Sequence, residues 1–413
     1  MHQIVFYIII GFLIFDYLLE QTLDYLNATR RSASLPEKLK GIYNEEKYRQ
    51  SQEYDKANHK FSMVTSTFNL LVLLLFLSFS GFAYVDEIAR SITSNTIFIA
   101  LLFFGIIMFA SDIINTPFSI YDTFVIEEKF GFNKTTPKIF VTDKLKGWLI
   151  TAIIGGGLLA LIIWFYQQTG RYFWIYAWAL VSLFTIFMTM FYTSLLLPLF
   201  NKLKPLEDGE LKAQITNFCK KVDFQLDNVF VMDGSKRSSK ANAFFSGLGK
   251  KKKIVLFDTL IDKLSTEEIV AVLAHEIGHY KKKHTLISVI SSVLQTGITF
   301  YILSLFVGNP VLSKALGAEE ASFHLGLVTF GFLYSPISTL IGLFMNIISR
   351  KNEYAADQFA AEKFNGKYLQ EALKSLSVNN LSNLTPHPAY VFVHYSHPPL
   401  LKRLQCIDLF NRD

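Results

Sequence analysis

Long apolar segments are the feature that most constrains how this chain can fold. Seven of them are long enough to cross a bilayer as helices, and none contains lysine or arginine: residues 3–19, 62–85, 95–115, 148–166, 173–197, 285–308 and 323–348. Hydrophobic residues make up 51% of the 413-residue chain and mean hydropathy is +0.31, which few soluble proteins of this length reach. We therefore predict an all-α membrane protein with seven transmembrane helices.

Two acidic residues lie within these segments. Asp16 is in the first, which is the shortest and which we interpret as a retained span rather than a cleaved signal peptide, because no basic region or small-residue cleavage site accompanies it. Asp112 is at the end of the third. A carboxylate at that depth should face protein or water, so we expect Asp112 to point away from lipid.

Basic residues give the bundle an orientation. Of the 40 lysines and arginines, 37 lie in every second connecting segment, at 20–61, 116–147, 198–284 and after 349, and only Arg90, Arg171 and Lys314 lie in the others. The positive-inside rule then predicts an outside N-terminus and a cytosolic C-terminus. The net charge of +6 reflects this orientation and not nucleic-acid binding; Lys250–Lys253 could touch anionic lipid, although a solvated run is the simpler interpretation.

The segments also divide the chain. We predict transmembrane helices 1–5 with cytosolic loops at 1–197, a small α+β cytosolic protease insertion at 198–284, helices 6 and 7 at 285–348, and a cytosolic tail at 349–413. Within the insertion, 211–222 has the pattern of an amphipathic helix, and 229–232, 241–245 and 253–257 have that of strands.

A metal-binding motif lies at the end of that insertion, in His275-Glu276-Ile277-Gly278-His279. In a helix, His275 and His279 are one turn apart on the same face and can share a metal ion, and Glu276 can reach a water beside it. Ser265 and Glu268 predict a capping box that starts this helix. A surface helix with two solvated histidines is the simpler alternative. In a continuous helix His284 would lie half a turn round from His275, so we expect it to face away from the metal site.

An acidic pair after the last span supplies a third ligand. Glu353 and Asp357 are one helical turn apart, and an antiparallel pair of spans six and seven would return Glu353 to the two histidines. Two histidines and one glutamate with an open fourth position are a usual catalytic zinc set, so we predict one zinc ion per chain. We assign Asp357 and Arg350 as supporting residues beside the ligands. A solvated acidic pair is the alternative.

Taken in order, these motifs resemble the type I CAAX prenyl proteases, integral-membrane zinc endopeptidases that trim prenylated proteins. The resemblance covers most of the chain, and its segments include VFVMDGSKRSSKANAFFSG (229–247), LAHEIGHYKKKH (273–284), SRKNEYAADQFA (349–360) and YSHPPLLKRL (395–404). It implies seven helices around a hydrophilic chamber, with zinc on His275, His279 and Glu353 and with Glu276 as general base. It also implies that Asn242 and His397 lie near the zinc.

The chain departs from this family in two places. Lys240-Ala241 stands where the family often has His-Ser, and the loop between spans six and seven is short beside those of eukaryotic members. The short loop favours a bacterial or other compact member of the family. We therefore expect either a bacterial inner membrane or, in a eukaryote, the endoplasmic reticulum membrane.

The reaction expected from these residues is hydrolysis of a peptide bond near the C-terminus of a prenylated protein or peptide. Zinc lowers the pKa of a bound water from roughly 16 to about 7, and Glu276 takes the proton and passes it to the leaving amine. His397 is a candidate for holding the oxyanion, although the residues alone do not separate that role from a structural one. We expect an extended substrate, lipidated or held in the membrane, to add a strand near Asn242, Ala243 and Phe244.

Two other functions compete with this one. A membrane quality-control protease would use the same chemistry on misfolded or stalled membrane proteins. An ion transporter would use acidic residues in its spans, but Asp16 and Asp112 are too few for one.

Overall fold

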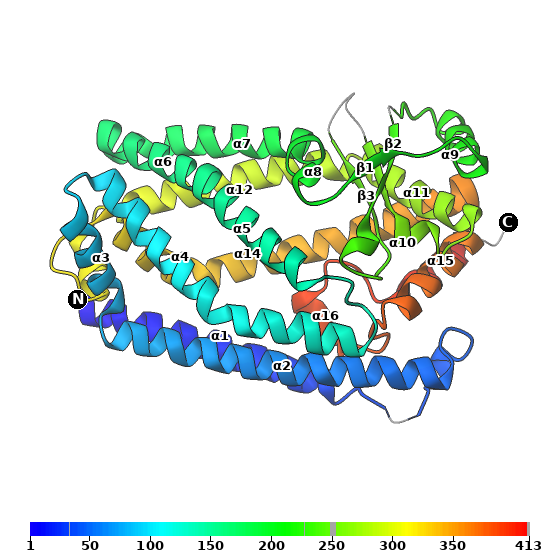
Figure 1. The fold of residues 1–413 in the computed structure, drawn as a ribbon, viewed down its shortest axis with the longest axis horizontal. Coiled ribbons are helices and arrows are strands. Elements are labelled where there is room, and N and C mark those ends of the chain that lie inside the picture. The colour runs from blue at the N-terminus through cyan, green and yellow to red at the C-terminus, as the bar shows by residue number, and fades with distance from the viewer. Residues whose placement is uncertain (33, 227, 248–252, 411–413) are drawn as a thin grey trace.

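The structure is a computed structural model that describes residues 1–413 except 33, 227, 248–252 and 411–413. Three residues of the lysine run, 250–252, therefore lie outside the described part of the chain. Long helices follow the length of the molecule, and a small sheet with short helices occupies one end (Figure 1). The two termini lie at opposite ends of the long axis, as an odd number of crossings requires.

The helices fall into two groups: those that make up the predicted spans, with α5 and α6 taken together as one long helix joined through η3, and the shorter helices outside the spans. The long helices are α1 (His2–Ala28), α2 (Glu45–Ser78), α4 (Thr96–Tyr121), α5 (Pro137–Ile150), α6 (Gly156–Thr169), α7 (Phe173–Leu195), α12 (His284–Phe306) and α14 (Phe323–Ala360). The shorter ones are α3 (Gly81–Ile92), α8 (Leu197–Phe200), α9 (Glu210–Lys221), α10 (Asp258–Ile261), α11 (Thr266–Lys281), α13 (Pro310–Ala315), α15 (Gly366–Asn379), α16 (Pro388–His394) and α17 (Leu400–Phe410). The π-helical turns η2 (Asp122–Glu127), η3 (Thr151–Gly155) and η6 (Ala361–Asn365) extend α4, join α5 to α6, and join α14 to α15.

Each of the seven predicted spans overlaps a long helix over most of its length. Within the described residues, six helical stretches are long and apolar enough to cross a membrane, and the stretch from Pro137 to Phe200 contains two predicted spans that separate at Gly170. Gly170 has a φ of +54°, a conformation that suits glycine, and α6 and α7 pack against each other on either side of it. Seven crossings are therefore consistent with the six stretches.

The predicted second span, 62–85, ends too late. Helix α2 stops at Ser78, Ser80 is left-handed with φ +54°, and a separate helix α3 begins at Gly81. A Cβ on Gly81 would lie 2.3 Å from the ring of Phe76, so the turn requires glycine there. The apolar run continues through Phe82, Ala83 and Val85, and this is why hydropathy alone placed the boundary inside α3.

Little of the membrane part is buried. In the apolar windows of the six stretches 6–17% of residues are buried, and many of the others are half-buried or exposed. Low burial of this kind is expected for helices that surround a chamber, which the resemblance to the prenyl proteases implies. The carboxylate of Asp112 accepts from Trp148 Nε1 at 3.0 Å and lies 2.5 Å from Lys144 Nζ, so it contacts protein, as expected.

A four-stranded sheet forms the centre of the insertion. Its strands are β1 (Leu203–Pro205), β2 (Asn228–Met232), β3 (Ala243–Ser246) and β4 (Lys253–Phe257), in the spatial order β1-β2-β4-β3. Strands β2 and β4 are parallel and the other two pairs are antiparallel. The three predicted strands are present, and β1 is an additional strand that was too short to be recognised. Strand β3 is an edge strand, so one of its sides has no strand partner within the described sheet.

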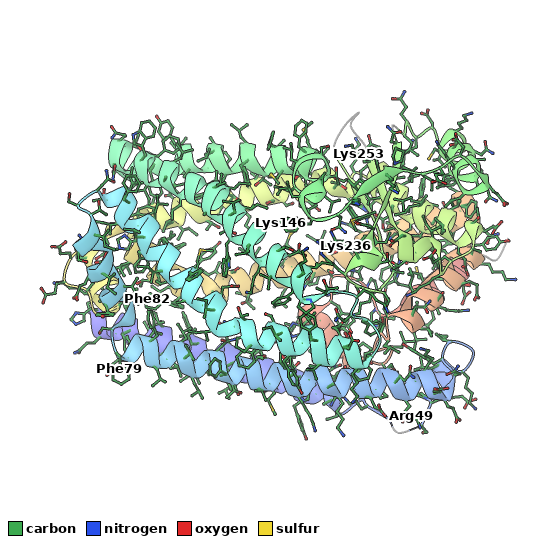
Figure 2. The ribbon with its side chains drawn as sticks, viewed as in Figure 1. Arg49, Phe79, Phe82, Lys146, Lys236 and Lys253 are labelled. Atoms are coloured by element: carbon green, nitrogen blue, oxygen red, sulfur yellow. The ribbon has the colours of Figure 1, made fainter. Side chains whose placement is uncertain are left out.

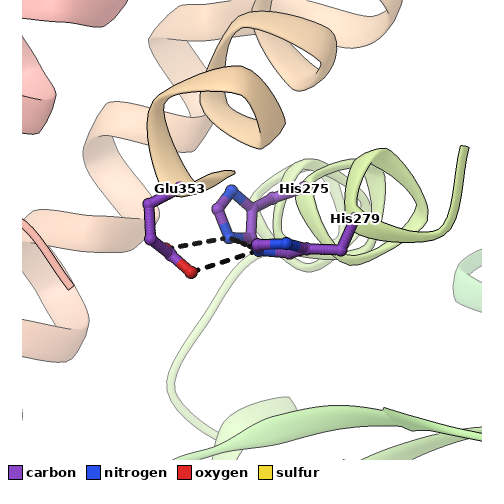
Figure 3. Close-up of side chains that lie close together, drawn as sticks. All are labelled: His275, His279 and Glu353. Atoms are coloured by element: carbon purple, nitrogen blue, oxygen red, sulfur yellow. Dashed lines mark hydrogen bonds and ion pairs between the residues drawn. The ribbon is translucent and has the colours of Figure 1, made fainter. Parts of the chain in front are cut away.

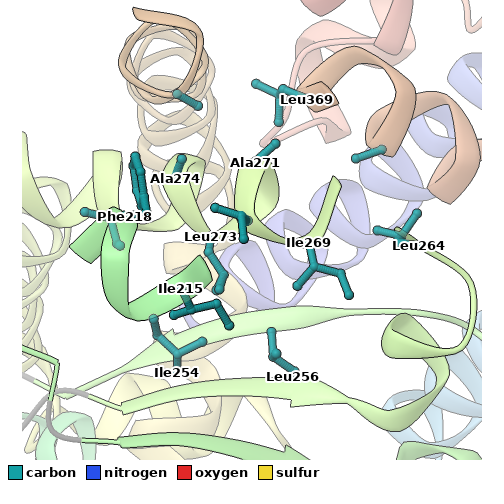
Figure 4. Close-up of a cluster of buried hydrophobic side chains, with 14 of the residues drawn as sticks. Ile215, Phe218, Ile254, Leu256, Leu264, Ile269, Ala271, Leu273, Ala274 and Leu369 are labelled. Atoms are coloured by element: carbon teal, nitrogen blue, oxygen red, sulfur yellow. The ribbon is translucent and has the colours of Figure 1, made fainter. Parts of the chain in front are cut away.

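One hydrophobic core joins the insertion to the C-terminal tail. It contains Ile254 and Leu256 of β4, Ile269 and Leu273 of α11, Ile215 and Phe218 of α9, and also Leu369 and Ile407 of the tail (Figure 4). The tail therefore packs onto the insertion across two intervening spans. Figure 2 shows Arg49, Lys236 and Lys253 toward the end that carries the sheet, and Phe79 and Phe82 at the opposite end.

Candidate metal centre

Helix α11 places the two histidines. The Ser265 hydroxyl accepts from the backbone N–H of Glu268 at 3.2 Å, and the Glu268 carboxylate accepts from the backbone N–H of Ser265 at 2.8 Å, so the predicted capping box is confirmed. Ile269, Leu273 and Ile277 are at most 2% exposed and fix one face of this helix in the core. His275 and His279 then lie on the face turned toward α14.

Close packing of α14 against α11 brings the glutamate into place. Gly278 allows it, because a Cβ there would lie 3.2 Å from both the Cα and the carbonyl oxygen of Ala356 and 3.2 Å from Cβ of Phe359. Ala356 is fully buried at this crossing. The next turn of α14 toward the membrane carries Glu353, so the contact between a glycine and an alanine sets how near the third side chain comes to the histidines.

The three side chains converge on one point (Figure 3). His275 Nε2 lies 3.4 Å from Glu353 Oε2, His279 Nε2 lies 3.2 Å from Glu353 Oε1, and the two Nε2 atoms are 3.2 Å apart. All three potential ligand atoms lie within 4.8 Å of one another. Oε2 of Glu353 is buried and has no hydrogen-bond partner among the described residues. Two imidazoles and a carboxylate so placed can hold a metal ion.

Asp357 and Arg403 support the ligands from behind. Asp357 is fully buried, and its Oδ1 lies 2.9 Å from His275 Nδ1, which leaves His275 Nε2 free on the side of the three ligands. Arg403, on α17, donates to both oxygens of Asp357, at 2.6 and 2.8 Å. Burial lowers the pKa of His275, but its bonds to Asp357 and Glu353 outweigh burial and raise the pKa to about 9. The two carboxylates therefore hold this ring firmly.

Arg350 does not occupy the supporting position that the sequence suggested. Its Nη1 donates to the backbone carbonyls of Val391 and Tyr395, at 3.3 and 2.5 Å, so it contacts the end of α16 instead of a ligand. Arg403 takes the supporting role, and sequence reasoning missed it although it lies in the quoted YSHPPLLKRL segment. The sequence feature that could have revealed Arg403 is its place on an otherwise apolar face of a helix. An arginine buried on such a face needs a carboxylate partner.

His284 also lies differently from the prediction. Helix α11 stops at Lys281, Lys283 is left-handed with φ +61°, and α12 starts at His284. Because of this break the His284 side chain points toward His279, and the Nδ1 atoms of the two rings lie 2.9 Å apart. The expectation that His284 faces away assumed a continuous helix and is wrong. His284 instead contacts the nitrogen of His279 that lies away from Glu353.

Two further predicted residues border the centre. Glu276 is partly exposed, and its carboxylate makes no ion pair with any described residue, which leaves it able to accept a proton. His397 Nε2 lies 3.3 Å from Glu353 Oε1, and its side chain is 64% exposed. The proline-rich start of α17 therefore brings an accessible imidazole to the open side of the three ligands.

The predicted substrate-binding residues lie at the start of the edge strand β3. The Asn242 carbonyl accepts from Phe257 N at 3.1 Å, and its side-chain oxygen accepts from Ala243 N at 2.9 Å. Its side-chain NH2 has no partner among the described residues. Phe244 lines a cavity of about 360 Å³ between β3, α7 and the start of α12, so space is present beside this strand.

Lys240 anchors the loop that leads to β3. Its ammonium donates to Glu127 at 2.8 Å and to the hydroxyl of Tyr54 at 2.9 Å, and it lies 4.5 Å from the ring centroid of Phe132. Burial lowers the pKa of Lys240, but the bonds to Glu127 and Tyr54 outweigh burial, so the pKa lies above its ordinary value. Lys240, which stands where the family often has histidine, therefore has a structural role: it connects the loop to α2 through Tyr54 and to η2 through Glu127.

The fold and this centre together define a helical membrane metalloprotease. Family models agree: the model described as "CAAX prenyl protease N-terminal, five membrane helices" matches residues 24–202, and that of peptidase family M48 matches 205–409. The chain belongs to the CAAX prenyl proteases of peptidase family M48.

Individual relatives extend over nearly the whole chain. It is 36% identical to the CAAX prenyl protease 1 homolog of Arabidopsis thaliana, over 97% of this chain and 96% of that protein, and 36% identical to CAAX prenyl protease 1 of Saccharomyces cerevisiae, over 97% and 94%. The crystal structure of S. mikatae Ste24p superposes with a TM-score of 0.93 at 35% identity, covering 98% of this chain and 99% of that one. The resemblance stated from the motifs is thereby confirmed.

Proposed function

We propose that this protein is a zinc endopeptidase that cleaves peptide bonds near the C-terminus of prenylated CAAX-type proteins or peptides. The observation that carries the proposal is the convergence of His275, His279 and Glu353 at one buried point in a chain that matches CAAX prenyl proteases almost from end to end. The same match favours a prenylated substrate over the misfolded proteins of a quality-control protease.

Zinc fits this donor set. Nitrogen and carboxylate ligands in a set of three, with a free coordination position, are typical of catalytic zinc, and the buried Oε2 of Glu353 has no hydrogen-bond partner among the described residues. When bound, zinc supplies a Lewis acid that lowers the pKa of water and polarises a carbonyl. Asp357 would keep His275 in the tautomer that presents Nε2, and Arg403 would neutralise the charge of Asp357.

Glu276 and His397 would act directly on the reacting groups. Glu276 would remove a proton from the attacking water and deliver it to the leaving amine, for which its unpaired and partly exposed carboxylate is suited. His397 would donate a hydrogen bond to the oxygen that gains charge on the scissile carbonyl, because it reaches the ligands from the exposed side.

Substrate would lie extended along the free edge of β3. Backbone groups of Ala243 and Phe244 would pair with it as a neighbouring strand does, and the free NH2 of Asn242 would donate to its backbone near the scissile bond. The cavity beside Phe244 leaves room for its side chains. In the membrane, we place the N-terminus outside and the centre on the cytosolic side, because 37 of the 40 basic residues lie in connections on that side.

Purified protein and a farnesylated CAAX peptide test this function. We expect cleavage near the peptide's C-terminus, loss of cleavage with a chelator, and recovery when zinc is returned. The same peptide without its farnesyl group is the control and should be cleaved more slowly. Equal cleavage of both peptides would point to a general membrane protease, and full activity after complete metal removal would refute the mechanism.

A further inference from the structure

A groove between α2 and α4 has a lining that includes none of the three metal-ligand residues. It has a volume of about 710 Å³ and runs between α2 and the end of α4 with η2. Ile126 at its edge is adjacent to Glu127, which pairs with Lys240 of the insertion, so the groove lies at the same end of the bundle as the metal centre. Its volume is within the range of small-molecule sites, roughly 300–1,000 Å³.

The floor of the groove is aromatic and apolar. Phe61 stacks on Tyr121 with ring centroids 5.7 Å apart, and Phe118 lies 6.4 Å from Phe61. Pro117 lies in the last turns of α4, and the π-helical turn η2 follows the end of α4 at Tyr121, so the helix is irregular where the groove lies. Phe61 and Val64 flank the start of the second predicted span, and Pro117 follows the end of the third. The floor is therefore at the depth where acyl chains meet headgroups.

The rim of the groove is basic. Lys56 and Lys60 are one turn apart on α2, Lys129 faces them from beyond η2, and all three are exposed. None of the three forms an ion pair with a described carboxylate, and Glu53 is the one acidic residue of the lining. Three ammonium groups against one carboxylate leave a net positive mouth above an apolar floor.

We propose that this lysine-rimmed groove binds an anionic membrane phospholipid. The headgroup phosphate would lie among Lys56, Lys60 and Lys129, and an acyl chain would lie on Phe61, Phe118 and Tyr121. Basic pockets between transmembrane helices at the membrane surface suit anionic headgroups, and charge complementarity here selects them over zwitterionic lipid. The proposal depends on the membrane location of the chain and not on its protease activity.

Lipid binding by the purified full-length protein tests the proposal. Dioleoyl phosphatidylglycerol and dioleoyl phosphatidylcholine have the same chains and differ in net charge, so native mass spectrometry at matched concentrations isolates the headgroup. We expect wild-type protein to retain phosphatidylglycerol in preference. Substituting Lys56, Lys60 and Lys129 by glutamine should weaken that binding about a hundredfold, because each basic residue near the surface contributes about fivefold.

Two further variants keep the test decisive. Glutamine at Lys134, Lys138 and Lys202 removes the same charge from exposed positions outside the groove and should leave phosphatidylglycerol binding unchanged. Ala57→Trp fills the groove from α2 and should weaken the binding of phosphatidylglycerol while all three lysines remain. Thermal melting of each variant in phosphatidylcholine micelles reports whether it is folded.

Three outcomes would overturn the proposal. The first is equal retention of the two lipids by wild-type protein, and the second is equal loss of binding in the groove and control variants. In the third, the groove variant keeps phosphatidylglycerol but shows a raised KM for a farnesylated peptide, which would assign the groove to the prenyl group of the substrate.

Discussion

At the scale of single residues, the centre depends on a few side chains with separable roles. His275, His279 and Glu353 converge, while Glu276 stands beside them without an ion partner among the described residues. A change at a ligand should therefore remove metal, whereas a change at Glu276 should leave the metal in place and affect only proton transfer.

Glu276→Gln is expected to keep bound zinc and to lose a hundredfold to ten-thousandfold in kcat, because the amide fills the same space but cannot accept a proton. Metal analysis and cleavage rates on one preparation measure the two effects. Glu267→Gln, nine residues earlier on the same helix, is the control. Cleavage by the Glu276→Gln variant at the wild-type rate would exclude Glu276 as the base.

Arg403→Met should lower zinc affinity by about tenfold to a hundredfold, because it leaves the buried carboxylate of Asp357 without its cation and loosens His275. Arg350→Met provides the comparison, because the hydrogen bonds of Arg350 to described residues all go to backbone carbonyls at the end of α16, and this variant should bind zinc normally. Zinc titration of both variants against a competing chelator distinguishes them. Equal affinities would show that Arg403 does not act through the metal ligands.

The sequence predicted the local parts of the centre better than the distant ones. The histidines and the capping box are fixed by spacing within one helix, so they could be derived without the fold. Arg403 lies 128 residues from His275, and only the packing of α17 reveals their proximity. His284 was misplaced because one left-handed residue, Lys283, redirects the chain, and a lysine gives no sign that it adopts that conformation.

At the scale of elements, the crossing of α11 and α14 and the free edge of β3 matter most. Hydropathy located the long helices because a run of about twenty apolar residues can form few structures other than a membrane-spanning helix. It could not locate the end of α2 within an apolar run, nor the three-residue strand β1, which depends on its pairing with β2.

Gly278→Ala should separate α11 from α14. The added methyl group would meet Ala356 and Phe359 at 3.2 Å, and overpacking of this kind costs about 1–3 kcal/mol. We expect a lower melting temperature and weaker zinc binding, because Glu353 moves with α14. Gly342→Ala, on α14 with nothing within 4 Å of the added Cβ, is the matched control and should leave both unchanged. Wild-type zinc affinity in the Gly278→Ala variant would show that this contact does not set the ligand geometry.

Asn242→Ala tests whether β3 clamps the substrate. A backbone clamp that acts in the transition state predicts that kcat and kcat/KM fall together, with zinc content and folding intact. A residue that merely shapes the turn before β3 predicts a lower melting temperature with normal turnover per folded molecule. Melting curves and rates from one preparation separate the two, and a normal kcat in a less stable protein would refute the clamp.

At the scale of the whole molecule, the topology follows from charge. Seven crossings would place the termini on opposite sides of the membrane, and from the basic connections we propose that the C-terminus is the cytosolic one. Reporter fusions at each terminus should therefore give opposite signals, with the C-terminal fusion active in the cytosol. Matching signals at the two ends would mean an even number of crossings, and opposite signals of reversed sign would mean that the centre faces outward.

The joint core of the insertion and the tail bears on how the protein is made. His279 and Glu353 are separated by the hairpin of α12 and α14, so synthesis delivers the histidines well before the glutamate and Arg403. A ribosome-bound chain that has not yet inserted this hairpin lacks a complete metal centre, so we expect it to be unable to cleave other proteins. We therefore expect hydrolytic activity to appear only in the finished, membrane-integrated enzyme.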